Sequence, residues 1–183
     1  MLGKLPRGNW RRRDTYINWN SSFTGRFGIL LNDIDTDIII PTDYLALNTV
    51  KEMAPFGFSP LRPELASLIK EGDIIVAGSN FGCGSSREQA PEVVKALGIK
   101  AVIADSFARI FFRNAINNGL LLIECPGLSQ IVKEGDEITV VPGNHITYED
   151  KDYPIASLPE NLMEILKAGG LVSAMRARNG LTD

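Results

Sequence analysis

Short apolar runs rich in β-branched residues alternate with segments of helical periodicity through the middle of the chain. The runs at 73–77 and 101–104 have the length and composition of buried strands. Helices are predicted after them, over 87–97 and 106–117, and Gly119 lies just beyond the end of the second. This alternation predicts an α/β fold in which helices flank a partly parallel sheet.

The remaining hydrophobic pattern predicts elements on both sides of this central unit. Strands are expected at 25–31, 38–40, 137–141, 145–148 and 153–156, and helices at 63–70 and 159–168. The sequence KEGD occurs at 70–73 and again at 133–136, and each copy is expected to turn the chain into a strand. The stretch 48–63 contains three prolines and little periodicity, which predicts a long loop able to close over a ligand.

A glycine-rich corner with the sequence GSNFGCGSSREQ lies between the first central strand and the helix that follows it. Gly78, Gly82 and Gly84 permit backbone angles and close approaches that other residues do not. Amide groups of the turn and the positive end of the helix would then face a bound group. An anion is therefore the expected ligand of this corner.

Ser85 and Glu88 also have the spacing of a capping box, with Ser85 as the N-cap of the helix. Capping explains Glu88 but not Arg87, because a cation in the first turn of a helix opposes the helix dipole. A carboxylate or phosphate ligand would remove that conflict. The pattern favours capping for Glu88 and anion binding for Arg87.

Common catalytic arrangements do not fit this corner. Ser85 stands where a Walker loop has its lysine, and the glycines miss the dinucleotide-binding spacing. The single histidine, His145, falls in a polar strand-like stretch where a structural role is usual, so no hydrolase triad is expected. A serine base here would need its alkoxide stabilised by turn amides and Arg87. Arg109 and Arg113, one helical turn apart, could face either an anion or solvent.

Composition and charge limit the function classes. The chain has 183 residues, 44% of them apolar, which suits one domain, and no apolar run reaches the length of a membrane span. Residues 1–24 carry five basic side chains and one acidic one, against 14 and 21 in the remainder, so a basic extension is predicted before a single domain at 25–183. Neither membrane nor nucleic-acid binding is expected. The two cysteines indicate the cytoplasm rather than a disulfide scaffold.

Three segments in the same order resemble the small subunits of 3-isopropylmalate dehydratase, the detached swivel domain of the aconitase superfamily. They are IDTDIIIPTDYL at 34–45, NFGCGSSREQAP at 80–91 and SFARIFFRNAINNGLL at 106–121. The resemblance implies an aconitase swivel-domain-like fold with β/β/α layers, and a hydro-lyase that is active only with a large subunit. In this family the large subunit carries a [4Fe-4S] cluster as Lewis acid. Three thiolates would be required to hold it, so this chain, with two cysteines, is expected to contain no metal site of its own.

The resemblance also assigns roles to single residues. Ser85 corresponds to the base that removes a carbon-bound proton, while Ser86 and Arg87 hold substrate carboxylate and Arg87 also helps to stabilise the alkoxide. The residues after the Tyr-Leu pair of the first segment face the variable side chain of the malate. The implied substrate-binding set is Thr36, Asp37, Tyr44, Leu45, Ala46, Leu47, Ser86 and Arg87.

The expected reaction is the dehydration and rehydration that converts 2-isopropylmalate to 3-isopropylmalate in leucine biosynthesis. Ala46 and Leu47 favour a branched alkyl group, because a second carboxylate unpaired against them would be costly to desolvate. Related citramalate, dimethylmalate and homoaconitate hydro-lyases are the alternatives, and a non-catalytic anion-binding module is the alternative of a different class. The expected partners are the large subunit and a small alkylmalate, and self-association of the isolated chain is left open.

Overall fold

The central sheet has three parallel strands in the order β2-β3-β4. In the computed structural model, which describes residues 22–26, 28 and 31–181, these strands are Ile74–Ala77, Ala101–Ala104 and Leu121–Glu124. Helix α4 (Gln89–Ala96) connects β2 to β3, and helix α5 (Arg109–Asn117) connects β3 to β4. The two β-α-β connections confirm the predicted parallel α/β unit.

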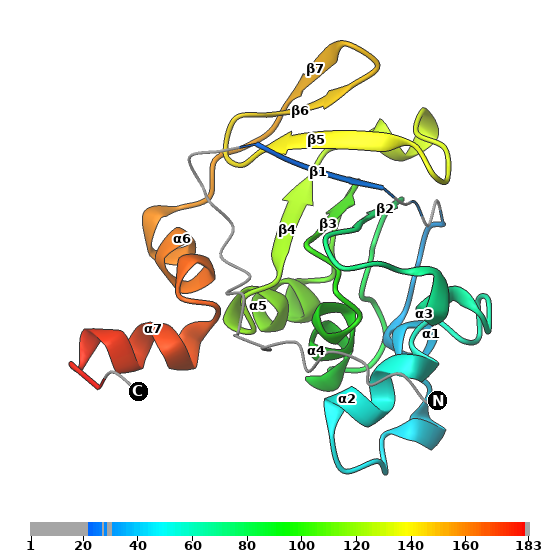
Figure 1. Ribbon diagram of the computed structural model, residues 1–183, viewed down its shortest axis with the longest axis vertical. Coiled ribbons are helices and arrows are strands. Elements are labelled where there is room, and N and C mark those ends of the chain that lie inside the picture. Colours follow the sequence, from blue (N-terminus) through cyan, green and yellow to red (C-terminus); the bar gives the residue numbers. More distant parts are fainter. Residues whose placement is uncertain (1–21, 27, 29–30, 182–183) are drawn as a thin grey trace, which may run out of the picture.

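A second sheet of four antiparallel strands, in the order β1-β5-β6-β7, lies across one side of the central sheet (Figure 1). Its strands are Phe23–Arg26, Glu137–Val141, His145–Tyr148 and Lys151–Pro154. Burial alternates along β5 and β6, as expected for a sheet with one face packed and the other exposed. The strands predicted in the second half of the chain are thus confirmed, with β7 beginning two residues before the predicted 153–156.

The parallel strands are buried on both faces and divide the core in two. On one face Ile75, Val102 and Leu122 pack among residues of α4 and α5. On the other face Ile74, Ile103 and Ile123 pack against the inward residues of the antiparallel sheet, including Ile138, Val140 and Ile146. The layers are therefore helix, parallel sheet and antiparallel sheet, in agreement with the predicted β/β/α architecture.

Further helices complete the structure. They are α1 (Thr36–Ile39), α2 (Val50–Met53), α3 (Leu65–Leu68), α6 (Glu160–Lys167) and α7 (Leu171–Arg178), with 3-10 turns at Thr42–Tyr44, Ala54–Phe56 and Leu128–Gln130. α6 confirms the helix predicted at 159–168, and α3 is a shorter form of the one predicted at 63–70. α7 was not predicted, because it buries no residue and so has no apolar stripe in its sequence. Within the described ranges, no helix combines the length and hydropathy needed to cross a bilayer.

The strand predicted at 38–40 is wrong, because most of it belongs to α1. Asp35 is the N-cap of this helix, and its carboxylate accepts a hydrogen bond of 2.8 Å from the amide of Ile38. Of the β-branched residues that suggested a strand, Ile38 and Ile39 lie in this helical turn, and Ile39 and Ile40 are buried in the core. Local capping and burial therefore outweigh β-propensity in this segment.

The long loop predicted at 48–63 is also wrong for much of its length. Thr49 and Glu52 form a reciprocal capping box that starts α2, and a 3-10 turn follows it directly. Phe58 at the end of this segment is fully buried. The segment is thus packed on the helical core, and its structure does not support the predicted closing loop.

The predicted helix caps are incorrect as well. α4 begins at Gln89, so Ser85 and Glu88 form no capping box and Arg87 lies before the helix. α5 begins at Arg109 with Ala108 at the N-cap position, three residues after the predicted start at 106. Ser106 instead accepts from the amide of Asn80, and Asp105 accepts from Gly127 and Ser129, so both polar groups hold neighbouring loops.

The two KEGD segments form the same turn, as predicted. In each, the aspartate carboxylate accepts from the lysine amide at 2.8 Å, at Asp73 and at Asp136. The strand predicted at 25–31 is confirmed only in part, since β1 starts at Phe23 and ends at Arg26. Residues 1–21 of the predicted basic extension lie outside the described residues, and the boundary at 24 and 25 stays a prediction.

Candidate functional site

Two segments that are distant in sequence run side by side and build the glycine-rich corner. Residues 31–36 follow residues 78–83 as an extra chain segment beyond the end of β2. Backbone hydrogen bonds join Gly78 to Leu31 at 3.0 Å, Asp33 to Ser79 at 2.9 Å, Gly82 to Ile34 at 2.7 Å and Thr36 to Cys83 at 2.9 Å. The first and second segments of the family resemblance are therefore brought together by their main chains.

Glycine is required at the corner for space and for backbone conformation. A Cβ on Gly78 would come within 2.0 Å of the Asn32 Oδ1 atom. Gly82 has a φ of +80°, and a Cβ there would lie 2.1 Å from Cγ of Phe111 on α5. The absence of side chains at these two positions lets the corner close on both the 31–36 segment and α5.

Thr36 positions Ser85 within the corner. The Thr36 hydroxyl donates to the Ser85 carbonyl oxygen at 2.9 Å, and the two hydroxyl oxygens lie 3.3 Å apart. Since the Thr36 proton is directed to the carbonyl, its oxygen is left to accept from the Ser85 hydroxyl. Thr36 is buried whereas Ser85 is exposed, so a fixed group orients a hydroxyl that a ligand can reach.

Arg87 is held by groups at the end of α1 and just after it. Its Nη1 donates to the Ile40 carbonyl and its Nη2 to the Thr42 hydroxyl, both at 2.8 Å, while Nη2 also forms an ion pair with Asp37. Thr42 in turn donates to Asp37 at 3.0 Å. Asp37 therefore contacts Arg87, so in this structure it acts as a positioning group for the arginine.

A cavity of about 240 Å³ opens beside Ser85. Its described lining comes from the corner, from α1 and from the start of α5, and comprises Thr36, Gly82, Cys83, Gly84, Ser85, Ser86, Arg87, Ala108, Arg109, Ile110, Phe111 and Asn114. Two of these residues are cationic and none is a carboxylate. We call this the serine cavity, and its charge suits an anionic ligand.

Not all predicted site residues line the serine cavity. Ser85, Ser86, Arg87 and Thr36 do, and Asp37 reaches it through Arg87. The other four predicted residues, Tyr44, Leu45, Ala46 and Leu47, follow α1 and are not part of the described lining. Tyr44 stacks on Phe56 with ring centroids 3.9 Å apart, Leu45 and Leu47 pack on the helical core, and Ala46 is exposed.

The corner also contains a thiol. Cys83 is half-buried and lines the serine cavity. Partial burial raises the pKa of this thiol, and the carboxylates of Asp35 and Asp33 raise it further. A raised pKa keeps the thiol protonated and weakly nucleophilic at neutral pH. In the part of the chain that the structure describes, no cluster of three or more histidine, cysteine or acidic side chains could hold a metal ion.

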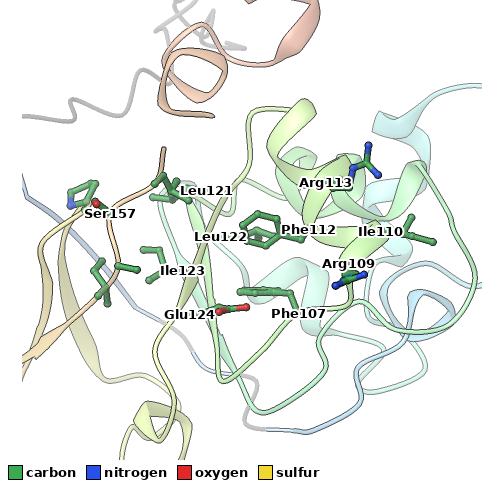
Figure 2. A pocket seen from close by; sticks show the side chains of 15 residues that line it. Phe107, Arg109, Ile110, Phe112, Arg113, Leu121, Leu122, Ile123, Glu124 and Ser157 are labelled. Carbon is green, nitrogen blue, oxygen red and sulfur yellow. The ribbon is translucent and has the colours of Figure 1, made fainter. Parts of the chain in front are cut away.

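A larger cavity of about 630 Å³ lies on the other side of α5 (Figure 2). Phe107, Phe112 and the strand residues Leu121–Ile123 give it mainly apolar walls. Arg109 and Ile110 line both cavities, whereas Arg113 lines only the larger one. The N-terminal end of α5 therefore separates the two spaces.

Sequence reasoning did not assign the contribution of α5 to the serine cavity. From the sequence, the side chain of Arg109 could face either an anion or solvent. The pattern assigned no role to Ile110 or Asn114. The sequence signal for the contribution of α5 is the third segment of the family resemblance. In its SFARIFF sequence, a small residue directly precedes Arg109. His145, expected to be structural, lies in β6 with its Nε2 atom 3.7 Å from a carboxylate oxygen of Asp152, outside the described lining of the serine cavity.

Comparisons with known proteins show the family to which this chain belongs. Residues 64–127 match the family described as the aconitase C-terminal domain, a range that contains Ser85, Arg87 and Arg109. The chain is 69% identical over 162 residues to the 3-isopropylmalate dehydratase small subunit of Lachnospira eligens, covering 88% of this chain and 99% of the relative. It is 54% identical over 144 residues to 3-isopropylmalate dehydratase small subunit 1 of Archaeoglobus fulgidus, covering 77% and 89%.

A solved structure agrees with the fold. The crystal structure of 3-isopropylmalate dehydratase from Methanocaldococcus jannaschii matches with a TM-score of 0.81 and 41% sequence identity. The match covers 88% of this chain and 97% of the other. The fold therefore has a counterpart over nearly the full length of that protein.

Proposed function

Since the chain belongs to the family of 3-isopropylmalate dehydratase small subunits, we propose that it supplies the base for interconverting 2-isopropylmalate and 3-isopropylmalate in leucine biosynthesis. The observation that carries the proposal is the serine cavity itself. An oriented and exposed Ser85 hydroxyl lies there beside two arginines, with no carboxylate in the described lining. This arrangement suits proton removal from a carbon next to a carboxylate of a small anionic substrate.

Ser85 is the proposed base. As an alkoxide it would take the proton from one substrate carbon as the hydroxyl leaves the neighbouring carbon. During hydration it would give the proton to that neighbouring carbon, while a hydroxyl adds to the carbon that had lost the proton. An alkoxide at Ser85 needs donors around it, and the amides of Ser85 and Ser86 donate to no acceptor within the described residues. The positive charge of Arg87, held in place by Asp37 and Ile40, adds to this stabilisation.

The leaving hydroxyl needs a Lewis acid that this chain does not provide. The sequence has two cysteines, and in the structure Cys83 lines the serine cavity while Cys125 belongs to the core on the other face of the sheet. A [4Fe-4S] cluster in a large subunit would supply that chemistry. We therefore place the complete active site between two subunits, with the serine cavity facing the partner.

The substrate side chain is the finer part of the proposal. Ala46 is exposed beside Leu45 and Leu47, so an apolar surface is available to a branched alkyl group held by the partner. An arginine or lysine for an extra carboxylate is absent from this short segment. These features support an alkylmalate over a substrate with a third carboxylate, and the two free thiols suit a reducing cytoplasm.

The test is a reconstituted complex assayed against a panel of alkylmalates. The purified chain is mixed anaerobically with its large subunit after cluster loading, and each subunit is also assayed alone. We expect turnover only in the mixture, with the highest kcat/KM for isopropylmalate. Turnover by the chain alone, or preference for another malate, would contradict the proposal, and an inactive mixture that still binds alkylmalate would favour a non-catalytic anion-binding module.

A further inference from the structure

We infer that Arg109 binds a carboxylate of the substrate in the serine cavity, an assignment that rests on the function proposed above. Three features of the residue lead to it. They are its place on α5, its lack of an ionic partner and its contrast with Arg87.

Arg109 occupies an electrostatically unfavourable position. It is the first residue of α5, where the helix dipole is positive, and no acidic residue lies in the first turn. No side chain caps this end of the helix. Within the described residues, the amides of Arg109, Ile110 and Phe111 donate to no acceptor, and all three residues line the serine cavity. A bound anion would accept from these amides and relieve the repulsion of the guanidinium.

The guanidinium of Arg109 has no ionic partner in the described part of the chain. Glu124 lines the larger cavity near Phe107, as Figure 2 shows, but no ion pair joins it to Arg109. Arg109 is exposed, so its five N–H donors are available to a ligand. A guanidinium presents two parallel donors that match the two oxygens of a carboxylate.

Arg87 is engaged in a way that Arg109 is not. The Nη atoms of Arg87 already bind Asp37, Ile40 and Thr42, and its side chain is 14% exposed. Its charge remains near Ser85, but much of its hydrogen-bonding capacity is used within the protein. The two arginines therefore have different roles. Arg87 provides a fixed positive charge beside the base, and the guanidinium of Arg109 binds the carboxylate.

The experiment compares Arg109→Gln with Arg113→Gln in the assembled complex. Arg113 is a matched control because it lies one turn further along α5, is exposed, and lines only the larger cavity. We expect Arg109→Gln to weaken equilibrium binding of 2-isopropylmalate roughly 10- to 100-fold, the usual range for a lost charged hydrogen bond. Arg113→Gln should bind as the parent does. Arg109→Lys keeps the positive charge but lacks the two parallel N–H donors, so it should retain part of the affinity that Arg109→Gln loses.

Folding and binding effects are separable for this substitution. Removing a cation from the first turn of a helix does not weaken the helix, so the melting temperature of Arg109→Gln should be unchanged or slightly higher. Binding is also measured with two analogues of 2-isopropylmalate, in each of which a methyl group replaces one carboxylate. The affinity difference between the parent and Arg109→Gln should vanish for one of the two analogues.

Two results would overturn the inference. One is that Arg109→Gln and Arg113→Gln bind 2-isopropylmalate with equal affinity. The other is that Arg109→Gln binds both analogues more weakly than the parent does. Calorimetric binding does not require turnover, so a parent complex that binds 2-isopropylmalate without converting it refutes the proposed function while Arg109 is still tested. A parent complex that binds no 2-isopropylmalate would overturn both.

Discussion

At the scale of single residues, the site depends on contacts between groups that are far apart in sequence. Thr36 and Ser85 are 49 positions apart, yet Thr36 contacts both the carbonyl and the hydroxyl of Ser85. Asp37 and Arg87 form a second such pair next to them. The family resemblance singled out all four residues, but residue patterns alone could not show that Asp37 would contact the arginine rather than a ligand.

Replacement of Ser85 by alanine is expected to abolish most turnover and leave the fold intact. Ser85 is exposed, and its hydroxyl contacts only the Thr36 hydroxyl among the described residues, so little stability should be lost. Loss of a central catalytic group of this kind lowers kcat about a thousandfold or more. The measurement is kcat of the reconstituted complex, with Ser79→Ala as control, since Ser79 is exposed on the same turn and bonds through its backbone. Equal activity of the two variants would assign the base to another residue.

Tyr148 and Asp136 form a hydrogen-bonded pair whose contribution to the stability of the folded protein depends on pH. The Tyr148 hydroxyl donates to Asp136 at 2.6 Å. This bond lowers the pKa of Asp136 below its ordinary 3.8, and the same bond raises the pKa of Tyr148 above its ordinary 10.0. The aspartate part of the stabilisation is present above its unfolded pKa and lost as pH falls through the lowered value. The tyrosine part is present below its unfolded pKa and lost as pH rises through the raised value.

Tyr148→Phe should therefore destabilise the protein most between about pH 4 and pH 10. The melting temperature is measured for the parent and the variant at pH 7 and at a series of acidic pH values, over which Asp136 becomes protonated. We expect a clear decrease at pH 7 and a smaller difference in acid. Tyr153→Phe is the control, because Tyr153 packs on the same core and no hydrogen bond of its hydroxyl is present in the described structure. A difference that is constant with pH would show that packing, not the hydrogen bond, explains the effect.

At the scale of elements, sequence patterns predicted the central strands and the helices between them well, and the four-residue helices poorly. The strands at 74–77 and 101–104 lie in continuous apolar runs, and the helices after them have clear periodicity, so their kind was predictable. Their starting residues were not, because the polar residues before each helix bond to neighbouring loops. α1 and α2 have four residues each, too few for any periodicity. The capping box of α2 was visible as Thr49 and Glu52 but lay in a segment whose prolines suggested a loop.

The serine cavity was predictable only in part, because the sequence did not show where α5 begins. The glycines and Ser85 stand out in the sequence, because their spacing marks a corner. The contribution of Arg109 depends on where α5 begins, and a helix start three residues earlier would place Arg109 inside the helix. The dipole argument made from sequence for Arg87 thus applies in the structure to Arg109 instead.

Gly82→Ala tests how closely the corner must approach α5. The new methyl group would overlap the Phe111 side chain, and the φ of +80° would be strained as well. Overpacking and a left-handed backbone together should lower the free energy of unfolding by roughly 2–5 kcal/mol. Gly72→Ala is the control, since Gly72 has a φ of +96° but nothing within 4 Å of its added Cβ. That variant should lose about 1–2 kcal/mol in urea unfolding, and equal losses in the two variants would show that contact with Phe111 does not matter.

At the scale of the whole molecule, the serine cavity lies where the helical layer meets the ends of the parallel strands. β2 leads into the corner. β3 leads to the start of α5 through Phe107, which forms a β-bridge with Phe81 of the corner. The antiparallel sheet lies on the opposite side of the parallel strands and contributes no residue to the described lining of the serine cavity. The helical side of the parallel sheet therefore carries the proposed site, and the antiparallel sheet packs against the other side.

The division of the core between two faces makes the length of the central strands critical. Successive residues of β3 point alternately to the helices and to the antiparallel sheet, with Val102 and Ala104 on one side and Ala101 and Ile103 on the other. An insertion of one residue within this strand would exchange the two sets and place large side chains where small ones now fit. It would also rotate the start of α5, and with it Arg109, away from Ser85. The four-residue length of β3 must therefore be kept for the glycine-rich corner and the start of α5 to meet.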